Sequence, residues 1–197
     1  DNDKYFKKSL FQPNKDSDYI DVISSYIGSN HHNIVLNNVD VANALEEAAI
    51  ERGVPGFVDI DSSLMLFCKE VKKDFTVCLS GECADEIFAG YPWYHKKEIL
   101  FENVFPWARN TNIRQRILKN GFLSDGEEYL QSAYKNTLKN ISYLESDDKI
   151  NKRMREMFVL NLSWFMQTLL ARKDNMSMAS SLEVRVPFCD YRLVEYA

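Results

Sequence analysis

The feature that most constrains the fold is a short apolar segment that ends in a break and a cluster of acids. Residues 75–79 read Phe-Thr-Val-Cys-Leu, which is typical of a strand, and Ser80 and Gly81 interrupt it. Because the segment is nearly all apolar and does not alternate with polar residues, it predicts a strand buried in the middle of a parallel sheet. Open α/β sheets bind ligands in the loops that leave the carboxyl ends of such strands, so the next residues are site candidates.

Three carboxylates, Glu82, Asp85 and Glu86, follow where the next helix should begin. A glycine after a strand lets a ligand approach the backbone, and a hydroxyl with unpaired amide groups suits phosphates. Carboxylates repel phosphates unless a cation lies between them, and Mg²⁺ is bound by one or two carboxylates together with phosphate oxygens. The residues alone therefore leave two interpretations open, a nucleotide and Mg²⁺ site or an acidic start of a helix.

The segments around this loop predict an α/β fold with a parallel sheet. The order strand, helix, helix, strand, loop, helix fits a parallel α/β layer over residues 1–91. The expected elements are a helix over 19–26 capped by Asp18 and ended by Gly28, a buried strand over 33–36, a helix from 39 to about 51 capped by Asn38 and ended by Gly53, and a helix capped by Asp61 with Leu64, Phe67, Cys68 and Val71 on its buried stripe.

Residues 92–197 are predicted to be mainly helical. Helices are expected near 113–118 and from Asp125 through 138, and the clearest helical period covers 146–171. We interpret its apolar stripe as core, not as a cofactor site. The stripe consists of Ile150, Met154, Met157, Phe158, Leu162, Phe165 and Leu169.

Composition narrows the class of protein. A net charge of −5 argues against a nucleic-acid surface, and no run approaches the roughly 20 apolar residues of a membrane span. The four cysteines form no Cys-x-x-Cys pair, which favours a reducing cytoplasm. His31 and His32 raise the alternative of a metal site, but adjacent strand residues point to opposite faces and no further ligand completes a set.

A second informative stretch covers residues 169–190, where charged and apolar residues alternate. Glu183 and Arg185 are predicted to form a structural ion pair, and Pro187 is expected to stop the backbone before a new helix.

Three motifs together carry a family resemblance. Residues 80–91 read Ser-Gly-Glu-Cys-Ala-Asp-Glu-Ile-Phe-Ala-Gly-Tyr, residues 172–179 read Arg-Lys-Asp-Asn-Met-Ser-Met-Ala, and residues 182–190 read Leu-Glu-Val-Arg-Val-Pro-Phe-Cys-Asp. In motif order, over almost the whole chain, the sequence closely resembles the synthetase domain of glutamine-hydrolysing asparagine synthetase. The resemblance implies an ATP-pyrophosphatase-type α/β fold that activates the side-chain carboxylate of aspartate with ATP, after which ammonia displaces AMP.

The resemblance also implies roles for individual residues. Ser80 and Gly81 would contact ATP, Glu82 would assist the β-aspartyl-AMP step, and Asp85 would help to hold Mg²⁺ and pyrophosphate. The implied cofactors are ATP and Mg²⁺, and the implied partners are aspartate and ammonia from an N-terminal glutaminase domain. The oligomeric state is left open, with a homodimer as one alternative.

The chain departs from the family pattern in four respects. The pyrophosphate loop Ser-Gly-Gly-x-Asp-Ser and the glutaminase domain are absent, and both ends look cut, so we expect a piece of a longer protein that makes no asparagine by itself. Cys83 stands where glycine is commonest, and we favour a small filler over a reactive cysteine. Asn175 stands where relatives often carry a basic residue, so Arg172 or Lys173 becomes the candidate to neutralise the α-phosphate.

Two other functions compete with this prediction. A related adenylating enzyme, such as a β-lactam synthetase, would use the same chemistry on another carboxylate. A non-catalytic helical interaction module would keep the fold without the chemistry, but the retained acids at 82, 85 and 86 argue against it.

Overall fold

The computed structural model describes residues 6–9, 14–119 and 121–197, so the start predicted to be cut, at residues 1–4, lies outside the described residues. The chain divides into two compact units. Unit 1 contains residues 1–82 and 169–187, and unit 2 contains residues 83–168 and 188–197. The first crossing between them falls inside the acidic loop, directly after Glu82. Each unit is described by itself.

Caps set the helix ends of unit 1. Asn37 caps the start of α3, because its side chain accepts a hydrogen bond from the N–H of Asp40 at 2.9 Å. Gly28 and Gly53 end α2 and α4 in the left-handed conformation, which confirms both predicted helix ends. The helices of this unit are α2 (Ser17–Ile27), α3 (Asn38–Asn43), α4 (Leu45–Arg52), α5 (Asp59–Lys72) and the later part of α12 (Met166–Met178).

Three predicted caps are wrong by one to three residues. Asn38 is the first residue of α3 and not its cap, and the helix expected over 39–51 is divided into α3 and α4 at Ala44. Asp18 and Asp61 lie inside the first turns of α2 and α5, where a carboxylate is also stabilised by the helix dipole. Asp61 is buried and accepts a hydrogen bond from the N–H of Phe57 at 2.8 Å.

The predicted strand over 33–36 does not form. Val35 is 84% exposed, and no strand in the described part of unit 1 lies beside this segment to accept its backbone hydrogen bonds.

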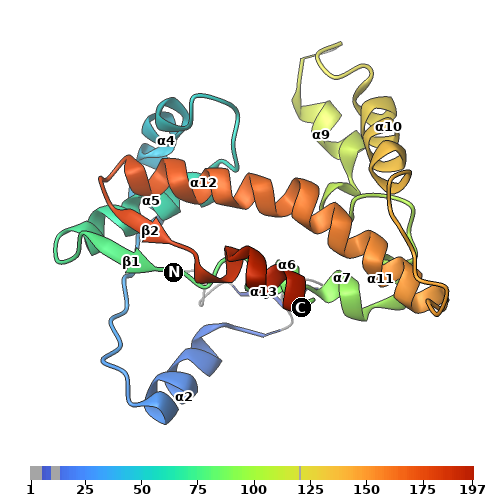
Figure 1. Ribbon diagram of the computed structural model, residues 1–197. Coiled ribbons are helices and arrows are strands. Elements are labelled where there is room, and N and C mark those ends of the chain that lie inside the picture. Colours follow the sequence, from blue (N-terminus) through green and yellow to red (C-terminus); the bar gives the residue numbers. More distant parts are fainter. Residues whose placement is uncertain (1–5, 10–13, 120) are drawn as a thin grey trace. The chain divides into compact units, whose positions relative to one another are not determined.

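The described residues contain a two-stranded parallel sheet made of β1 (Val77–Leu79) and β2 (Glu183–Arg185), which lie side by side in Figure 1. The parallel strand predicted from residues 75–79 is therefore confirmed. Its predicted burial is wrong, because Phe75 is 61% and Leu79 is 73% exposed when only one neighbouring strand is present in the described chain. Helix-rich with a small parallel sheet, the chain is consistent with an α/β fold.

The core of unit 1 is small. Met65 of α5 and Met176 of α12 are fully buried against Ala44 and Ala48. Cys68 lies on the buried stripe of α5 as predicted, whereas Phe67 is exposed. Such a core buries few large side chains, so the position of the loop after β1 also depends on polar contacts.

Unit 2 is a helical assembly with an aromatic core. Tyr91 stacks on Trp93 at 4.3 Å between ring centroids, and Trp107 stacks on Phe165 at 4.8 Å. Its elements are α6 (Ala84–Ile87), α7 (Pro92–His95), α8 (Lys97–Leu100), η1 (Pro106–Ala108), α9 (Thr111–Ile117), α10 (Gly126–Leu138), α11 (Lys149–Leu160), the π-turn η2 (Asn161–Phe165), the start of α12, the end of η3 (Pro187–Cys189) and α13 (Tyr191–Tyr196).

The individual helices predicted after residue 110 are confirmed. The expected helices near 113–118 and from Asp125 onward are α9 and α10. The periodic segment 146–171 becomes α11, η2 and the start of α12, with Met157 fully buried in the core. Ile150 at its beginning is 46% exposed, because the first turn of α11 extends beyond the core contacts.

Candidate functional site

The acidic loop begins at the carboxyl end of β1, where its backbone is held by β2. The N–H of Ser80 donates to the carbonyl of Arg185 at 2.9 Å, which extends the strand pairing by one residue. The Ser80 hydroxyl accepts a hydrogen bond from the N–H of Glu82 at 3.4 Å. Gly81 is exposed, and a side chain there would meet nothing within 4 Å. Packing therefore does not require this glycine, and the backbone stays open to a ligand.

Glu82 is the centre of a charged cluster in unit 1. Its Oε1 lies 3.0 Å from Nη2 of Arg172 and 3.2 Å from Nζ of Lys173, both on α12. The three side chains are only 14–19% exposed, so water screens this cluster weakly. These contacts join two motifs that are 90 residues apart in the sequence. One carboxylate and two cations leave a net charge of +1, which suits an anionic ligand.

The cluster is not saturated by the protein. Glu82 Oε2 and Arg172 Nε are buried and have no hydrogen-bond partner among the described residues. Such atoms are costly to leave unpaired, and their presence in a charged cluster indicates a place where a ligand supplies the missing partners. Asn175, one helical turn beyond Arg172, is partly buried and brings no charge.

Two free thiols, Cys68 and Cys78, belong to the same unit. Burial raises the pKa of the Cys68 thiol, and the positive charge of Lys173 offsets this only in part. Cys68 therefore remains a neutral thiol at physiological pH and is poorly reactive.

In unit 2, Asp85 on α6 is exposed and its place depends on Gly90. The N–H of Gly90 donates to the Asp85 carbonyl at 3.0 Å. A Cβ atom at residue 90 would lie 1.9 Å from Asp85 Oδ1, closer than any real contact. The absence of a side chain at Gly90 therefore makes room for the Asp85 carboxylate.

Glu86, the third acid of the loop, is part of a buried hydrogen-bond network and has a structural role. Glu86 is buried, and its Oε1 accepts a hydrogen bond from the Tyr91 hydroxyl at 2.8 Å. The Tyr94 hydroxyl donates to the Glu86 carbonyl, and burial together with the charge of Glu86 raises the pKa of Tyr94 strongly. Tyr94 thus stays protonated, and this network fixes α6 to α7.

Cys83 is neither a filler nor a free thiol. It forms a disulfide with Cys189, although the sequence favoured a small filler in a reducing environment. Cys83 is buried and has a positive φ of 77°, a backbone conformation that favours glycine. No sequence pattern signals this pairing, because the two cysteines lie 106 residues apart.

Other candidate positions add little to the site. Within the described ranges no group of three or more His, Cys, Asp or Glu side chains could hold a metal ion, and His31 contacts Asn33 at 2.9 Å. Glu183 and Arg185 form the predicted ion pair at 2.7 Å, on the surface. In the part of the chain that the structure describes, no helix has the length and apolar character that a bilayer crossing requires.

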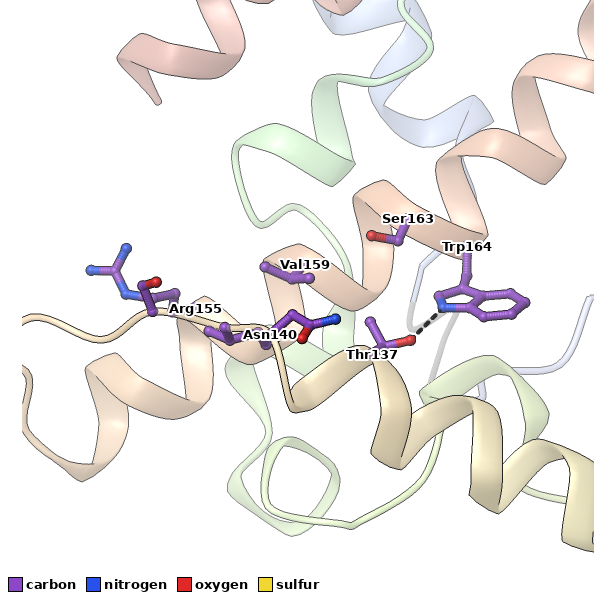
Figure 2. Close-up of a pocket in the computed structure, with 8 residues that line it drawn as sticks. Thr137, Asn140, Arg155, Val159, Ser163 and Trp164 are labelled. Carbon is purple, nitrogen blue, oxygen red and sulfur yellow. Dashed lines mark hydrogen bonds between the residues drawn. The ribbon is translucent and has the colours of Figure 1, made fainter.

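A cavity of about 560 Å³ in unit 2 has none of the predicted site residues in its lining (Figure 2). Trp164 Nε1 donates to Thr137 Oγ1 at 2.9 Å across one side of it. Arg155, which also lines it, is already paired with Asp147. The cavity therefore offers no cluster of reactive groups.

Comparison with known proteins identifies related sequences. The family model described as asparagine synthase matches residues 5–197. Asparagine synthetase [glutamine-hydrolyzing] 3 of Bacillus subtilis is 48% identical over 198 residues, which cover 100% of this chain and 32% of that protein. Asparagine synthetase 1 of the same organism is 32% identical over 64% of this chain and 25% of its own length. The mouse (Mus musculus) asparagine synthetase is 22% identical over 88% of this chain and 23% of its own length. The chain thus spans a third or less of the length of these relatives.

Proposed function

Because the chain belongs to the asparagine synthase family, we propose that it forms part of the synthetase site of a glutamine-hydrolysing asparagine synthetase. In this reaction the side-chain carboxylate of aspartate attacks the α-phosphorus of ATP, and the bond to pyrophosphate breaks. Ammonia, supplied by a glutaminase domain, then attacks the β-aspartyl carbonyl carbon and AMP leaves, which gives asparagine. An ATP-pyrophosphatase-type fold is part of the same proposal.

The observation that carries the proposal is the contact of Glu82 with Arg172 and Lys173. It joins the loop after β1 with the motif on α12, which are two of the three stretches that carry the family resemblance. The net positive cluster suits the phosphates of ATP, and Ser80 and Gly81 present an open backbone beside it. Lys173, held at Glu82, takes the place of the cation missing at Asn175 and neutralises the α-phosphate together with Arg172.

Glu82 is the candidate catalytic residue. Its Oε1 is occupied by both cations, whereas Oε2 is buried without a partner among the described residues. Oε2 is therefore the oxygen that orients a substrate or accepts a proton during formation and use of the β-aspartyl-AMP. Fixed by two cations, this carboxylate is held in one orientation before the substrate arrives.

Asp85 is the candidate residue for Mg²⁺. Its carboxylate is exposed and not used in an ion pair among the described residues, and Mg²⁺ needs only one or two carboxylates when phosphate oxygens supply further ligands. Glu82 is not needed as a second ligand, since protein cations already neutralise it. When bound, the ion would neutralise the pyrophosphate that leaves.

The test is aspartate-dependent exchange of pyrophosphate into ATP by the full-length protein. We expect Glu82→Gln to lower the exchange rate by roughly 10²- to 10⁴-fold, the usual contribution of a positioned acid or base. The matched control is Glu183→Gln, which removes an exposed carboxylate of the same unit and should leave exchange unchanged. Exchange by Glu82→Gln at the parental rate would exclude the catalytic role.

A further inference from the structure

We propose that Cys83 and Cys189 are a reversible thiol–disulfide pair, so that the acidic loop contains a site of redox modification. The bond attaches the loop to the η3 segment, 106 residues later in the chain. Cys83 follows Glu82 directly and lies two residues before Asp85. A covalent change at this position therefore alters the backbone between the two carboxylates that the proposed function uses.

The two sulfur atoms differ in access. Cys83 is 3% exposed, whereas Cys189 is only partly buried, so a small thiol reaches the sulfur of Cys189 first. The thiolate attacks Sγ of Cys189, the S–S bond breaks, and Cys83 leaves as a thiolate that takes up a proton. A second small thiol then attacks the mixed disulfide and releases Cys189. The protein gains two electrons and two protons, and two small thiols become one disulfide.

Reduction leaves the loop with weaker restraints at this point. Helix α6, which carries Asp85, begins at Ala84, immediately after Cys83. One side-chain contact that stays after reduction is that of Phe88 with Phe188, whose rings meet edge to face at 6.1 Å. Cys83 also adopts a left-handed conformation that a residue with a side chain leaves readily once it is released. The oxidised state therefore holds the start of α6 in place, and the reduced state loosens it.

The two free cysteines, Cys68 and Cys78, serve as internal references for the redox state of the disulfide. Cys68 and Cys78 are free, and both belong to unit 1, whereas Cys83 and Cys189 both belong to unit 2. The redox state of the pair can therefore change without any exchange of partners inside its own unit.

The first measurement tests the pair itself. The full-length protein is equilibrated in buffers with increasing ratios of reduced to oxidised glutathione, quenched with acid and alkylated, and the peptides with each cysteine are quantified by mass spectrometry. We expect Cys83 and Cys189 to become alkylated together in one two-electron transition, while Cys68 and Cys78 are unchanged across the series. A bond that persists in excess dithiothreitol under native conditions, or one that never forms in oxidised glutathione, would overturn the proposal.

The second measurement tests the consequence for activity and rests on the proposed function. We expect the half-saturating concentration of Mg-ATP in pyrophosphate exchange to rise several-fold on reduction. Cys189→Ser should show the reduced behaviour in every buffer, and the control Cys78→Ser should retain the response. Equal values in both redox states would contradict the effect on the loop. Absence of exchange in both states would instead overturn the proposed function, while the glutathione titration still decides the redox pair.

Discussion

Arg153 of unit 2 and Arg172 of unit 1 both have largely buried side chains paired with a carboxylate, but their hydrogen-bond donors are satisfied to different degrees. In unit 2 the Arg153 side chain is 7% exposed and every nitrogen of its guanidinium group donates a hydrogen bond. The acceptors are the carbonyls of Leu100 and Glu102, the Tyr134 hydroxyl and the Glu156 carboxylate. In unit 1, Arg172 donates to Glu82 while its buried Nε has no partner among the described residues.

The number of unused hydrogen-bond donors distinguishes an arginine that stabilises the fold from one that can still bind a ligand. A buried arginine in which every nitrogen already donates ties together the segments around it and has little capacity for a ligand. A buried arginine with an unused donor, beside a carboxylate with an unused oxygen, leaves room for a ligand to complete the network. By this criterion Arg153 belongs to the scaffold. Arg52 of unit 1, whose side chain is 6% exposed beside Asp61, also has unused donors, so Arg172 is the site candidate because it contacts Glu82 in the loop after β1.

The largest expected effect on stability is that of Arg153→Met. The substitution leaves the buried Leu100 carbonyl, the partly buried Glu102 carbonyl and the Glu156 carboxylate without their donor, and breaking a buried charged network of this kind costs about 3–5 kcal/mol. The measurement is urea unfolding followed by tryptophan fluorescence. All three tryptophans, Trp93, Trp107 and Trp164, lie in unit 2, so the signal reports this unit.

The matched control is Arg155→Met, two residues further along α11. Arg155 is more than a third exposed and, among the described residues, its ion pair is with Asp147, so its loss should cost about 1 kcal/mol or less. If Arg153→Met and Arg155→Met lost the same stability, the burial of Arg153 and its four hydrogen bonds would not account for its contribution to stability.

Helix periodicity predicts unit 2 better than strand composition predicts unit 1. An amphipathic helix forms its hydrogen bonds internally, so the spacing of Met154, Met157 and Phe158 is enough to identify α11 and its buried face. A strand depends on its neighbours. The segment 75–79 identifies a parallel strand, but its burial depends on further strands and layers that the described chain does not contain.

The candidate site was predictable as a list of residue types but not as a network. The sequence identified Glu82 and named Arg172 and Lys173 as candidate cations, yet only the fold places both cations on the same carboxylate oxygen. The disulfide of Cys83 with Cys189 and the space that Gly90 leaves for Asp85 both depend on atoms brought together by folding. Such contacts have no period or spacing from which a single sequence could predict them.

An intermediate effect is expected for Gly90→Ala. The added methyl group collides with the Asp85 carboxylate and lies 3.2 Å from Asp85 Cα, so the segment must shift and unit 2 should lose about 1–3 kcal/mol. Because the carboxylate is displaced, we also expect the Mg²⁺ concentration needed for half-maximal pyrophosphate exchange to rise. Tryptophan fluorescence and exchange assays at varied Mg²⁺ measure the two effects.

The control for this change is Gly126→Ala at the start of α10. There a Cβ atom would come no closer than 3.5 Å to Leu123, so stability should change by about 0.5 kcal/mol or less. A second comparison removes the Asp85 carboxylate, with which the added methyl group would collide. In an Asp85→Ala background, Gly90→Ala should cost clearly less than in the parent, since the two effects are coupled through one contact. Equal costs in both backgrounds would mean that Gly90 acts independently of Asp85.

The smallest effect on stability is expected for Arg172→Met, although its effect on activity should be large. Lys173 remains 3.2 Å from Glu82 Oε1 and methionine retains much of the buried volume, so the loss should be about 1 kcal/mol. Hydrogen exchange at the Leu182 amide measures this loss of stability, because that N–H donates to the Ser177 carbonyl at 3.0 Å inside unit 1. Pyrophosphate exchange by the full-length protein should fall at least about tenfold, equivalent to about 1.4 kcal/mol in the barrier.

The control for Arg172→Met is Arg185→Met, which removes an exposed partner of Glu183 in the same unit and should alter neither measurement. If Arg172→Met instead destabilised unit 1 as much as Arg153→Met destabilises unit 2, and pyrophosphate exchange persisted, both arginines would be structural. The unpaired Nε would then be a tolerated defect in packing, because a group that binds substrate cannot be removed without a loss of rate.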